Sequence, residues 1–140
     1  MTRCVPRPAA ASAGALAVAA VLLFGAAAPL TSSAQIQRPF PATALRGELR
    51  FGQAPEVTLN GQPARLAPGA RIRGTDNLLQ LSGSLAGQTH VVHYTVDPYG
   101  LLLDVWLLTP AERARQPWPR SAAEAAAWRF DAAAQTWSRP

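Results

Sequence analysis

Cysteine and lysine are the residues that this sequence most clearly lacks. It has one cysteine, Cys4, and no lysine, and it has only two histidines. A chain without a second cysteine forms no internal disulfide, binds no zinc through a set of thiolates, and has no thiol nucleophile beyond residue 4. Its fold must therefore be held together by a hydrophobic core alone.

The apolar run near the start of the chain is too short for a membrane span. Gly14–Ala28 is apolar throughout, but crossing a bilayer takes about 20 such residues. It follows the basic segment Met1–Arg7 and precedes a proline and small residues that end at Ala34. This order is typical of a secretory signal peptide. We expect residues 1–34 to be cleaved, leaving a periplasmic or secreted chain from Gln35 without a stable transmembrane anchor.

The positive charge is modest once the expected leader is set aside. The formal net charge of +5 includes Arg3 and Arg7, so the chain from Gln35 onward carries +3. Its arginines are scattered and form no basic stripe in the sequence. We expect no nucleic-acid partner, because recognition of nucleic acid relies on clustered cations. The expected partner is an envelope protein or polymer of unknown identity.

Short alternating segments predict β-strands in the first half of the chain. In Leu45–Phe51, apolar or small residues alternate with charged ones, which predicts a buried face and a solvated face that carries Arg46 and Arg50. Asn60-Gly61 predicts a tight hairpin turn, since both residues tolerate the positive φ of a type I′ turn. Pro68-Gly69 is interpreted as a further turn between two short strands.

Two longer strands are predicted to form the centre of the domain. Thr89–Val96 and Leu101–Leu108 flank the turn Asp97–Gly100. The second strand is apolar on both faces, so we expect it to be covered on both sides. The apolar segment Leu78–Leu81 is expected to enter the core.

Two capping boxes predict short helices near the C-terminus. Thr109 precedes a proline and a glutamate, and Ser121 precedes a glutamate at the same spacing, as at a helix N-terminus. The last segment is open to two interpretations. Either Trp128–Phe130 and Gln135–Trp137 pair as a hairpin, or one alanine-rich helix covers Ala122–Ala134. The hairpin is favoured.

These segments together predict a mainly β fold, either a compact antiparallel meander or a small barrel of six to seven short strands. A short C-terminal helix and a possible terminal hairpin would follow. We divide the expected product into an extended N-terminal arm at residues 35–43, a β domain at 44–116 and a tryptophan-rich appendage at 117–140. The appendage is expected to cover Leu102, Trp106 and Leu108, which would otherwise form an exposed apolar stripe.

The histidines and carboxylates point to no catalytic or metal site. His90 and His93 are three residues apart on one strand, so their side chains lie on opposite faces and cannot bind one metal ion. We expect no metal and no cofactor, and we place His93 at the surface. Asp97 and Asp104 flank one turn, and a carboxylate pair can act on glycans. Asp97 also fits a purely structural role in that turn. Asp104 is interpreted either as a buried acid or as the partner of a neighbouring arginine, so no catalytic residue is assigned.

Tryptophans and paired arginines are the remaining candidates for binding. Trp106, Trp128 and Trp137 are candidates because indole rings stack on sugars and anchor partners, although the stronger expectation is that they fill the core. Arg71 and Arg73 share the outer face of a short predicted strand. They would contact an anionic envelope surface, for example its phosphates, or form an ordinary solvated face.

Four turn and cap segments carry a resemblance to known proteins. They lie within Gly47–Glu112 and are Leu59–Leu66, Pro68–Gly74, Asp97–Gly100 and Thr109–Glu112. In these segments the chain resembles small uncharacterised exported proteins of Gram-negative proteobacteria. The resemblance implies an exported location and a small β fold. It implies no activity and gives no residue a functional role.

We therefore expect a non-catalytic periplasmic module that binds or supports a cell-envelope component. Two alternatives remain open. One is a small enzyme or enzyme inhibitor that acts on envelope polymers, which a cleft beside Asp97 and Asp104 would favour. The other is a soluble carrier of a small apolar ligand, which an internal cavity in the barrel would favour.

Overall fold

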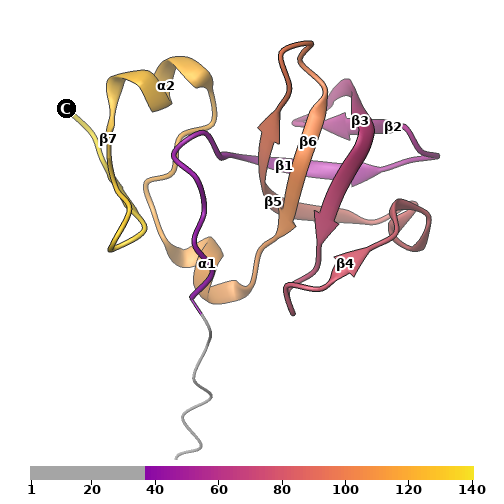
Figure 1. The fold of residues 1–140 in the computed structure, drawn as a ribbon, viewed down its shortest axis with the longest axis horizontal. Helices are drawn as coiled ribbons and strands as arrows, with labels where there is room; N and C mark the ends of the chain where they lie inside the picture. The colour runs from indigo at the N-terminus through magenta and orange to yellow at the C-terminus, as the bar shows by residue number, and fades with distance from the viewer. Residues whose placement is uncertain (1–36) are drawn as a thin grey trace, which may run out of the picture. The chain divides into compact units, whose positions relative to one another are not determined.

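The computed structural model describes residues 37–140, so the expected signal peptide at 1–34 lies outside the described residues. Strands dominate the described part, as the sequence predicts (Figure 1). In chain order the elements are β1 (Leu45–Phe51), β2 (Glu56–Leu59), β3 (Gln62–Arg73), β4 (Leu79–Gln80), a 3-10 turn η1 (Ser82–Leu85), β5 (Thr89–Val96), β6 (Leu102–Leu107), α1 (Pro110–Ala114), α2 (Ala122–Ala127), β7 (Arg129–Asp131) and β8 (Thr136–Ser138).

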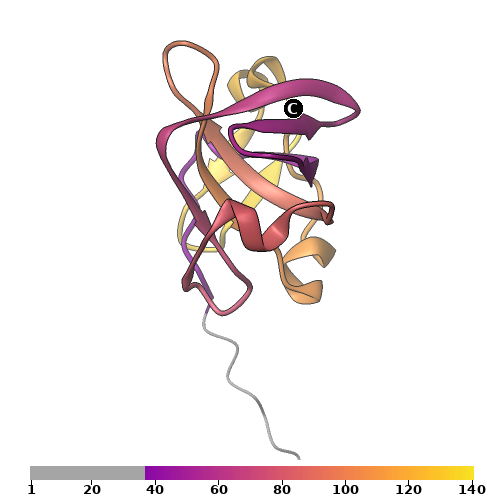
Figure 2. The same cartoon turned by 90° about the vertical axis from the view of Figure 1, so that its right-hand side faces the viewer.

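Five strands close into a barrel. Around it they follow the order β1–β2–β3–β6–β5 and back to β1, and β4 adds a short edge strand beside β3. Every pairing in the barrel is antiparallel except that of β3 with β6. This connectivity is that of the five-stranded Greek-key barrels of the OB type. Of the two predicted forms, the chain thus has the small barrel, whose strands curl around one another in Figure 2.

The two predicted turns in the first half have different outcomes. Asn60 and Gly61 have φ of 51° and 78° and form the tight turn between β2 and β3, which confirms the prediction. The interpretation of Pro68-Gly69 as a turn between strands is wrong, because β3 runs through it. Gly69 has φ of 77° and lies where the pairing with β6 changes register, between Leu66 and Arg71. A bulge there bends one long strand, so that β3 pairs first with β2 and then with β6.

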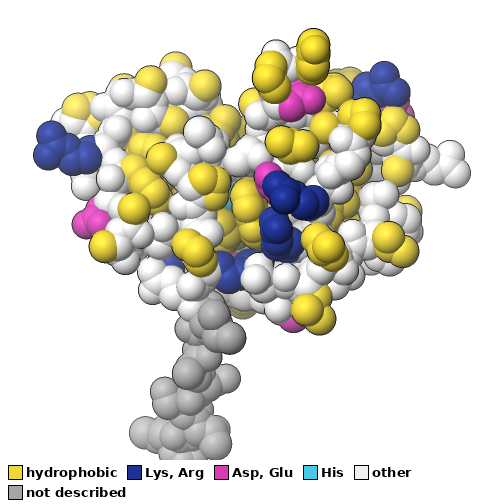
Figure 3. All heavy atoms as spheres, in the orientation of Figure 1, with side chains coloured by type: hydrophobic (Ala, Val, Ile, Leu, Met, Phe, Trp, Pro, Cys, Tyr) yellow, Lys and Arg dark blue, Asp and Glu magenta, His cyan; other side chains and the backbone are white. Residues whose placement is uncertain are grey.

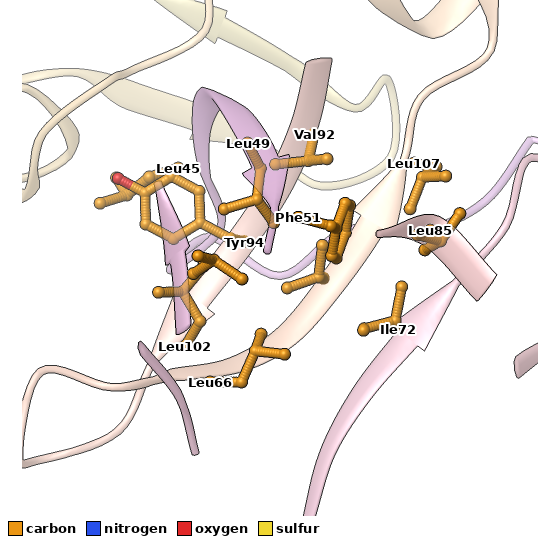
Figure 4. Packing of buried hydrophobic residues seen from close by; sticks show 12 residues of the cluster. Leu45, Leu49, Phe51, Leu66, Ile72, Leu85, Val92, Tyr94, Leu102 and Leu107 are labelled. Carbon is orange, nitrogen blue, oxygen red and sulfur yellow. The ribbon is translucent and has the colours of Figure 1, made fainter. Parts of the chain in front are cut away.

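Apolar side chains fill the interior of the barrel (Figure 4). Strands turn alternate side chains inward, and the innermost residues come from β1, β5 and β6. Those at most 1% exposed are Leu49, Phe51, Val92, Leu102 and Val105. The barrel therefore encloses its own hydrophobic core, and η1 contributes the buried Leu85 to it.

A second hydrophobic cluster lies outside the barrel, between β6 and the C-terminal segment. Trp106 and Leu108 pack there with Trp118 and Trp137, as the sequence predicts for the cover of this strand. The expectation that Leu102 lies under the same cover is wrong, because the register of the β5–β6 pairing shifts before it and Leu102 packs in the barrel core. Trp118 also donates its indole N–H to the carbonyl of Ala44 at 2.9 Å. The terminal hairpin is confirmed as β7 paired with β8, with α2 ahead of it in place of one long helix.

The N-terminal arm is part of this second cluster. Phe40 is 3% exposed and meets Trp106 and Trp118 edge-on, with ring centroids 5.8 and 5.9 Å away. Its backbone N–H donates to Oε1 of Gln135 at 2.7 Å, and Nε2 of Gln135 donates back to the Phe40 carbonyl at 3.3 Å. These contacts fasten the arm to the C-terminal hairpin.

The segment around β4 departs from the sequence prediction. Leu78, Leu79 and Leu81 are 64%, 68% and 81% exposed, so the expectation that Leu78–Leu81 enters the core is wrong. The reason is positional: β4 is two residues long and pairs only with β3, at the end of the sheet. Among the described residues, neither hydrophobic cluster includes any of these three leucines.

Candidate binding face

Three of the five candidate binding residues lie together on the outer face of the barrel. In the parallel pairing of β3 with β6, Arg71 lies opposite Asp104 and Arg73 lies opposite Trp106. Ile72 and Val105, the pair between them, are buried in the barrel core. Side chains alternate along a strand, so the flanking pairs point outward. The fold thus brings Arg71 and Asp104 together although they are 33 positions apart.

Asp104 holds both guanidinium groups. Nε of Arg71 donates to Oδ1 at 2.8 Å and Nη2 donates to Oδ2 at 3.0 Å, while Nη1 of Arg73 donates to Oδ1 at 3.4 Å. The guanidinium of Arg73 also lies over the ring of Trp106, 5.8 Å from its centroid. These contacts restrict both side chains, which lowers the entropy that a ligand would have to remove.

The two arginines keep donors for a further partner. The side chain of Arg71 is 55% exposed and that of Arg73 is 26% exposed, whereas that of Asp104 is 14% exposed. A guanidinium has five N–H donors, and Asp104 takes only some of them. Figure 3 shows this basic patch over β3 and β6, with acidic atoms at its margin and hydrophobic atoms on both sides. The arrangement suits an anion that accepts hydrogen bonds from both arginines.

The other two candidate tryptophans lie in the appendage. Trp137 is 5% exposed and Trp106 is 8% exposed, so each offers little surface and mainly fills the second cluster. Trp128 is half-buried and borders a groove together with Arg129 and Arg139. The Arg139 guanidinium lies 5.1 Å from the centroid of the Trp128 ring and covers it. The structure does not bring Trp128 to Arg71 and Arg73.

Asp97 and Asp104 have separate structural partners. Oδ1 of Asp97 accepts the backbone N–H groups of Tyr99 at 2.8 Å and Leu101 at 2.9 Å, which is the role that its turn position predicts. Asp104 accepts hydrogen bonds from Arg71 and Arg73. Each carboxylate is thus engaged in a different contact. Within residues 37–140, no group of three or more His, Cys, Asp or Glu side chains is placed to hold a metal ion.

A buried ion pair that sequence reasoning missed joins the N-terminal arm to α1. Nε of Arg38 donates to Oε1 of Glu112 at 2.8 Å, and its other nitrogens donate to the carbonyls of Gly74 and Leu107 at 2.7 Å each. Glu112 is also the N3 residue of the capping box with Thr109, and this predicted box is confirmed. Burial raises the pKa of Glu112, but hydrogen bonds from Arg38 and Thr109 outweigh it and leave the pKa lowered.

Arg46 and His93 are buried beside this pair, so their expected places at the surface are wrong. Arg46 donates to Nε2 of His93 at 3.2 Å and to the carbonyl of Glu112 at 2.8 Å. His93 is 1% exposed and stacks on Trp118 with ring centroids 4.0 Å apart. Burial, and then the charge of Arg46, lowers the pKa of His93 to about 2. Burial also lowers the pKa of Arg46 to about 10, which leaves it charged at neutral pH.

Arg46 and His93 are buried because other segments of the chain cover the outer face of the barrel at β1 and β5. The alternation in β1 predicts a solvated face only if nothing packs on it, and the arm, α1 and the appendage pack there. The tryptophan-rich tail signals that some face is covered, but not which polar residues lie beneath. Each of these side chains has at least one partner in the protein interior, although Nδ1 of His93 has none. We therefore assign them to stability, and Arg71 and Arg73 to the candidate binding face.

No protein-family model, curated protein or solved structure matches this chain. Among residues 37–140, no helix has the length and apolar character needed to cross a membrane.

Proposed function

We propose that the chain is a non-catalytic module that binds an anionic component of the cell envelope through Arg71 and Arg73. The observation that carries the proposal is the pair of solvent-accessible guanidinium groups, that of Arg71 exposed and that of Arg73 half-buried, which Asp104 and Trp106 hold side by side. The envelope location comes from the predicted signal peptide and is part of the proposal.

The chemistry of arginine favours an anionic partner. Its planar fork of donors matches the oxygens of phosphate and carboxylate groups, and it is less strongly hydrated than lysine. Here the guanidinium group of Arg71 is also held in place by Asp104 before any partner binds. OB-type barrels often bind oligosaccharides or nucleic acids, but a shared fold assigns no ligand. The proposal therefore rests on the arginine pair.

Two further observations support binding over the alternatives that the sequence leaves open. Asp97 and Asp104, the only carboxylates considered for catalysis, are engaged by backbone amides and by arginines. The barrel interior, where a carrier would hold an apolar ligand, is filled by side chains such as Phe51 and Val105.

Co-sedimentation with a washed cell-envelope fraction tests the proposal. The chain from Gln35 onward should sediment with the fraction at low salt and be released by high salt, because exposed charges are screened. The double variant R71Q/R73Q should lose most of this binding. The matched control is R65Q, since Arg65 is an exposed arginine of the same strand that pairs with Glu56. Equal sedimentation of R71Q/R73Q and the unmodified chain would overturn the proposal.

A further inference from the structure

Three exposed leucines adjoin the arginine pair. In the pairing of β3 with β4, Arg73 lies directly opposite Leu79. Leu81 has an extended backbone, with φ of −81° and ψ of 134°, so it points to the same side as Leu79. Leu78, the residue that precedes β4, is also exposed. We call Arg71, Arg73 and these three leucines the arginine–leucine face.

This clustering is unusual for the described surface. The five large hydrophobic residues that are most exposed there include all three leucines, at 64% to 81%. The other two, Val96 and Tyr99, lie at the β5–β6 turn. Single exposed apolar residues need no explanation, but neighbouring ones mark sites of interaction. Because this cluster lies beside two guanidinium groups, its partner should offer both anionic and apolar groups.

We propose that the arginine–leucine face docks on the surface of an anionic phospholipid bilayer. The inference rests on the proposed function and names the envelope component. Arg71 and Arg73 would contact lipid phosphates, while Leu78, Leu79 and Leu81 enter the boundary between headgroups and acyl chains.

The shape and charge of the face favour a bilayer over a protein partner. The leucines lie in the edge strand β4 or directly beside it, and each is mostly exposed to solvent. A protein partner would need a matching pocket for each protruding side chain, whereas a fluid bilayer adapts to them. Apolar groups adjoining phosphate-binding groups also match the layered chemistry of a lipid surface, in which phosphates lie above the acyl chains.

Both the arginines and the leucines of the arginine–leucine face are needed for measurable binding to a bilayer. Asp104 neutralises part of the charge, so Arg71, Arg73 and Asp104 together carry a formal charge of only +1. Electrostatic attraction of that size is weak at physiological salt. The leucines supply the apolar part of the binding, and the arginines supply the preference for anionic lipid.

Co-flotation with lipid vesicles tests the inference. The chain from Gln35 onward is used, because the apolar segment Gly14–Ala28 would itself enter lipid and the described residues belong to one compact unit with its own core. Vesicles of phosphatidylethanolamine and phosphatidylglycerol are compared with vesicles of phosphatidylcholine alone. Circular dichroism confirms that each variant is folded.

Three variants separate the contributions. L78S/L79S/L81S should lower the affinity for anionic vesicles about tenfold or more, since binding scales with the apolar area inserted. R71Q/R73Q should reduce binding to anionic vesicles to the level seen with neutral ones. Y99S is the matched control, because Tyr99 is 88% exposed but lies at the β5–β6 turn. Its binding should equal that of the unmodified chain.

The outcomes distinguish this inference from the proposed function. Failure of the unmodified chain to float with anionic vesicles, or equal binding by the triple leucine variant, would overturn the bilayer inference. If the chain still sediments with the envelope fraction through Arg71 and Arg73, the proposed function holds with a non-lipid anion as the partner. Competition of vesicle binding by soluble inorganic phosphate alone, with no effect of the leucines, would likewise overturn the inference.

Discussion

Arg46 and Arg71 both point outward from a barrel strand, but their surroundings differ. Arg46, on β1, is 6% exposed beneath the appendage, and protein carbonyls and His93 accept its hydrogen bonds. Arg71, on β3, has 55% of its side chain exposed and only one carboxylate partner, Asp104. The same residue type thus stabilises the fold on the covered face and remains open to a ligand on the other.

The covered face combines apolar packing with buried charges that bond to protein groups. Trp106, Trp118 and Trp137 pack together there, and the Arg38–Glu112 pair is buried where the arm meets α1. On the arginine–leucine face, by contrast, Leu79 and Leu81 belong to neither hydrophobic cluster of the described residues. Damage to the covered face should therefore cost stability, whereas changes to the arginine–leucine face should cost binding.

Removal of the cover should have the largest effect. Truncation after Arg115 deletes Trp118 and Trp137 and exposes Phe40 and Trp106 to solvent. We expect a loss of about 5 kcal/mol or more, comparable with the whole stability of many small domains, and hence unfolding or aggregation. Thermal unfolding and size-exclusion chromatography measure this. A truncated chain that melts as before, with unchanged tryptophan fluorescence, would show that the appendage is not a cover.

Loss of one partner of the buried ion pair should have the next largest effect. Glu112→Gln leaves the charge of Arg38 buried without a counterion and weakens the helix cap, which should cost about 3–5 kcal/mol. The control is Glu56→Gln, which breaks the exposed pair with Arg65 and should cost less than about 1 kcal/mol. Denaturant unfolding gives both values. Similar losses in the two variants would contradict the distinction between covered and exposed charges.

Stability should fall as the pH is lowered below 6.5, because of His93. Its pKa is about 2 in the folded chain and 6.5 when unperturbed, so between these values the unfolded state binds the proton more readily. The free energy of unfolding should drop by about 1 kcal/mol between pH 7 and pH 5.5. Below the ordinary pKa of Glu112, protonation of that carboxylate should reduce stability further, since its folded pKa is lowered.

Denaturant unfolding at a series of pH values tests this dependence. His93→Gln should remove most of the slope between pH 7 and pH 5.5, whereas His90→Gln, the matched control, should leave the slope in place. A slope that persists in His93→Gln would assign the pH dependence to another group.

Substitution of the exposed leucines should have the smallest effect on stability. Leu79→Ser alters a side chain of a residue that is 68% exposed and should change the free energy of unfolding by no more than about 0.5 kcal/mol. Leu102→Ala, the matched change in the barrel core, should cost about 2–5 kcal/mol. A marked destabilisation by Leu79→Ser would mean that Leu79 is packed in the folded chain.

Local signals in the sequence were sufficient for turns and caps. The Asn60-Gly61 turn and the Thr109 capping box depend on neighbouring residues alone, and both are confirmed. The shared face of Arg71 and Arg73 follows from alternation along one strand. An arginine partner for Asp104 is one interpretation that the sequence offers. Which arginines bind it could not be predicted, because Asp104 reaches them through a parallel pairing that depends on the bulge at Gly69.

Burial was harder to predict than secondary structure. Leu78–Leu81 is apolar, so the sequence favours the core, but the segment lies at the sheet edge where nothing in either hydrophobic cluster covers it. Arg46 and His93 have the opposite outcome, since their polar character favours the surface while the appendage buries them. In each case the deciding contact is made, or not made, by a segment distant in the sequence.

The division between the two faces is tested most directly by one measurement on L78S/L79S/L81S. Its affinity for vesicles of phosphatidylethanolamine and phosphatidylglycerol and its melting temperature are determined on the same preparation, beside the unmodified chain from Gln35. We predict an affinity at least about tenfold lower with an unchanged melting temperature. An unchanged affinity would contradict the account, because the leucines would then contribute nothing to binding.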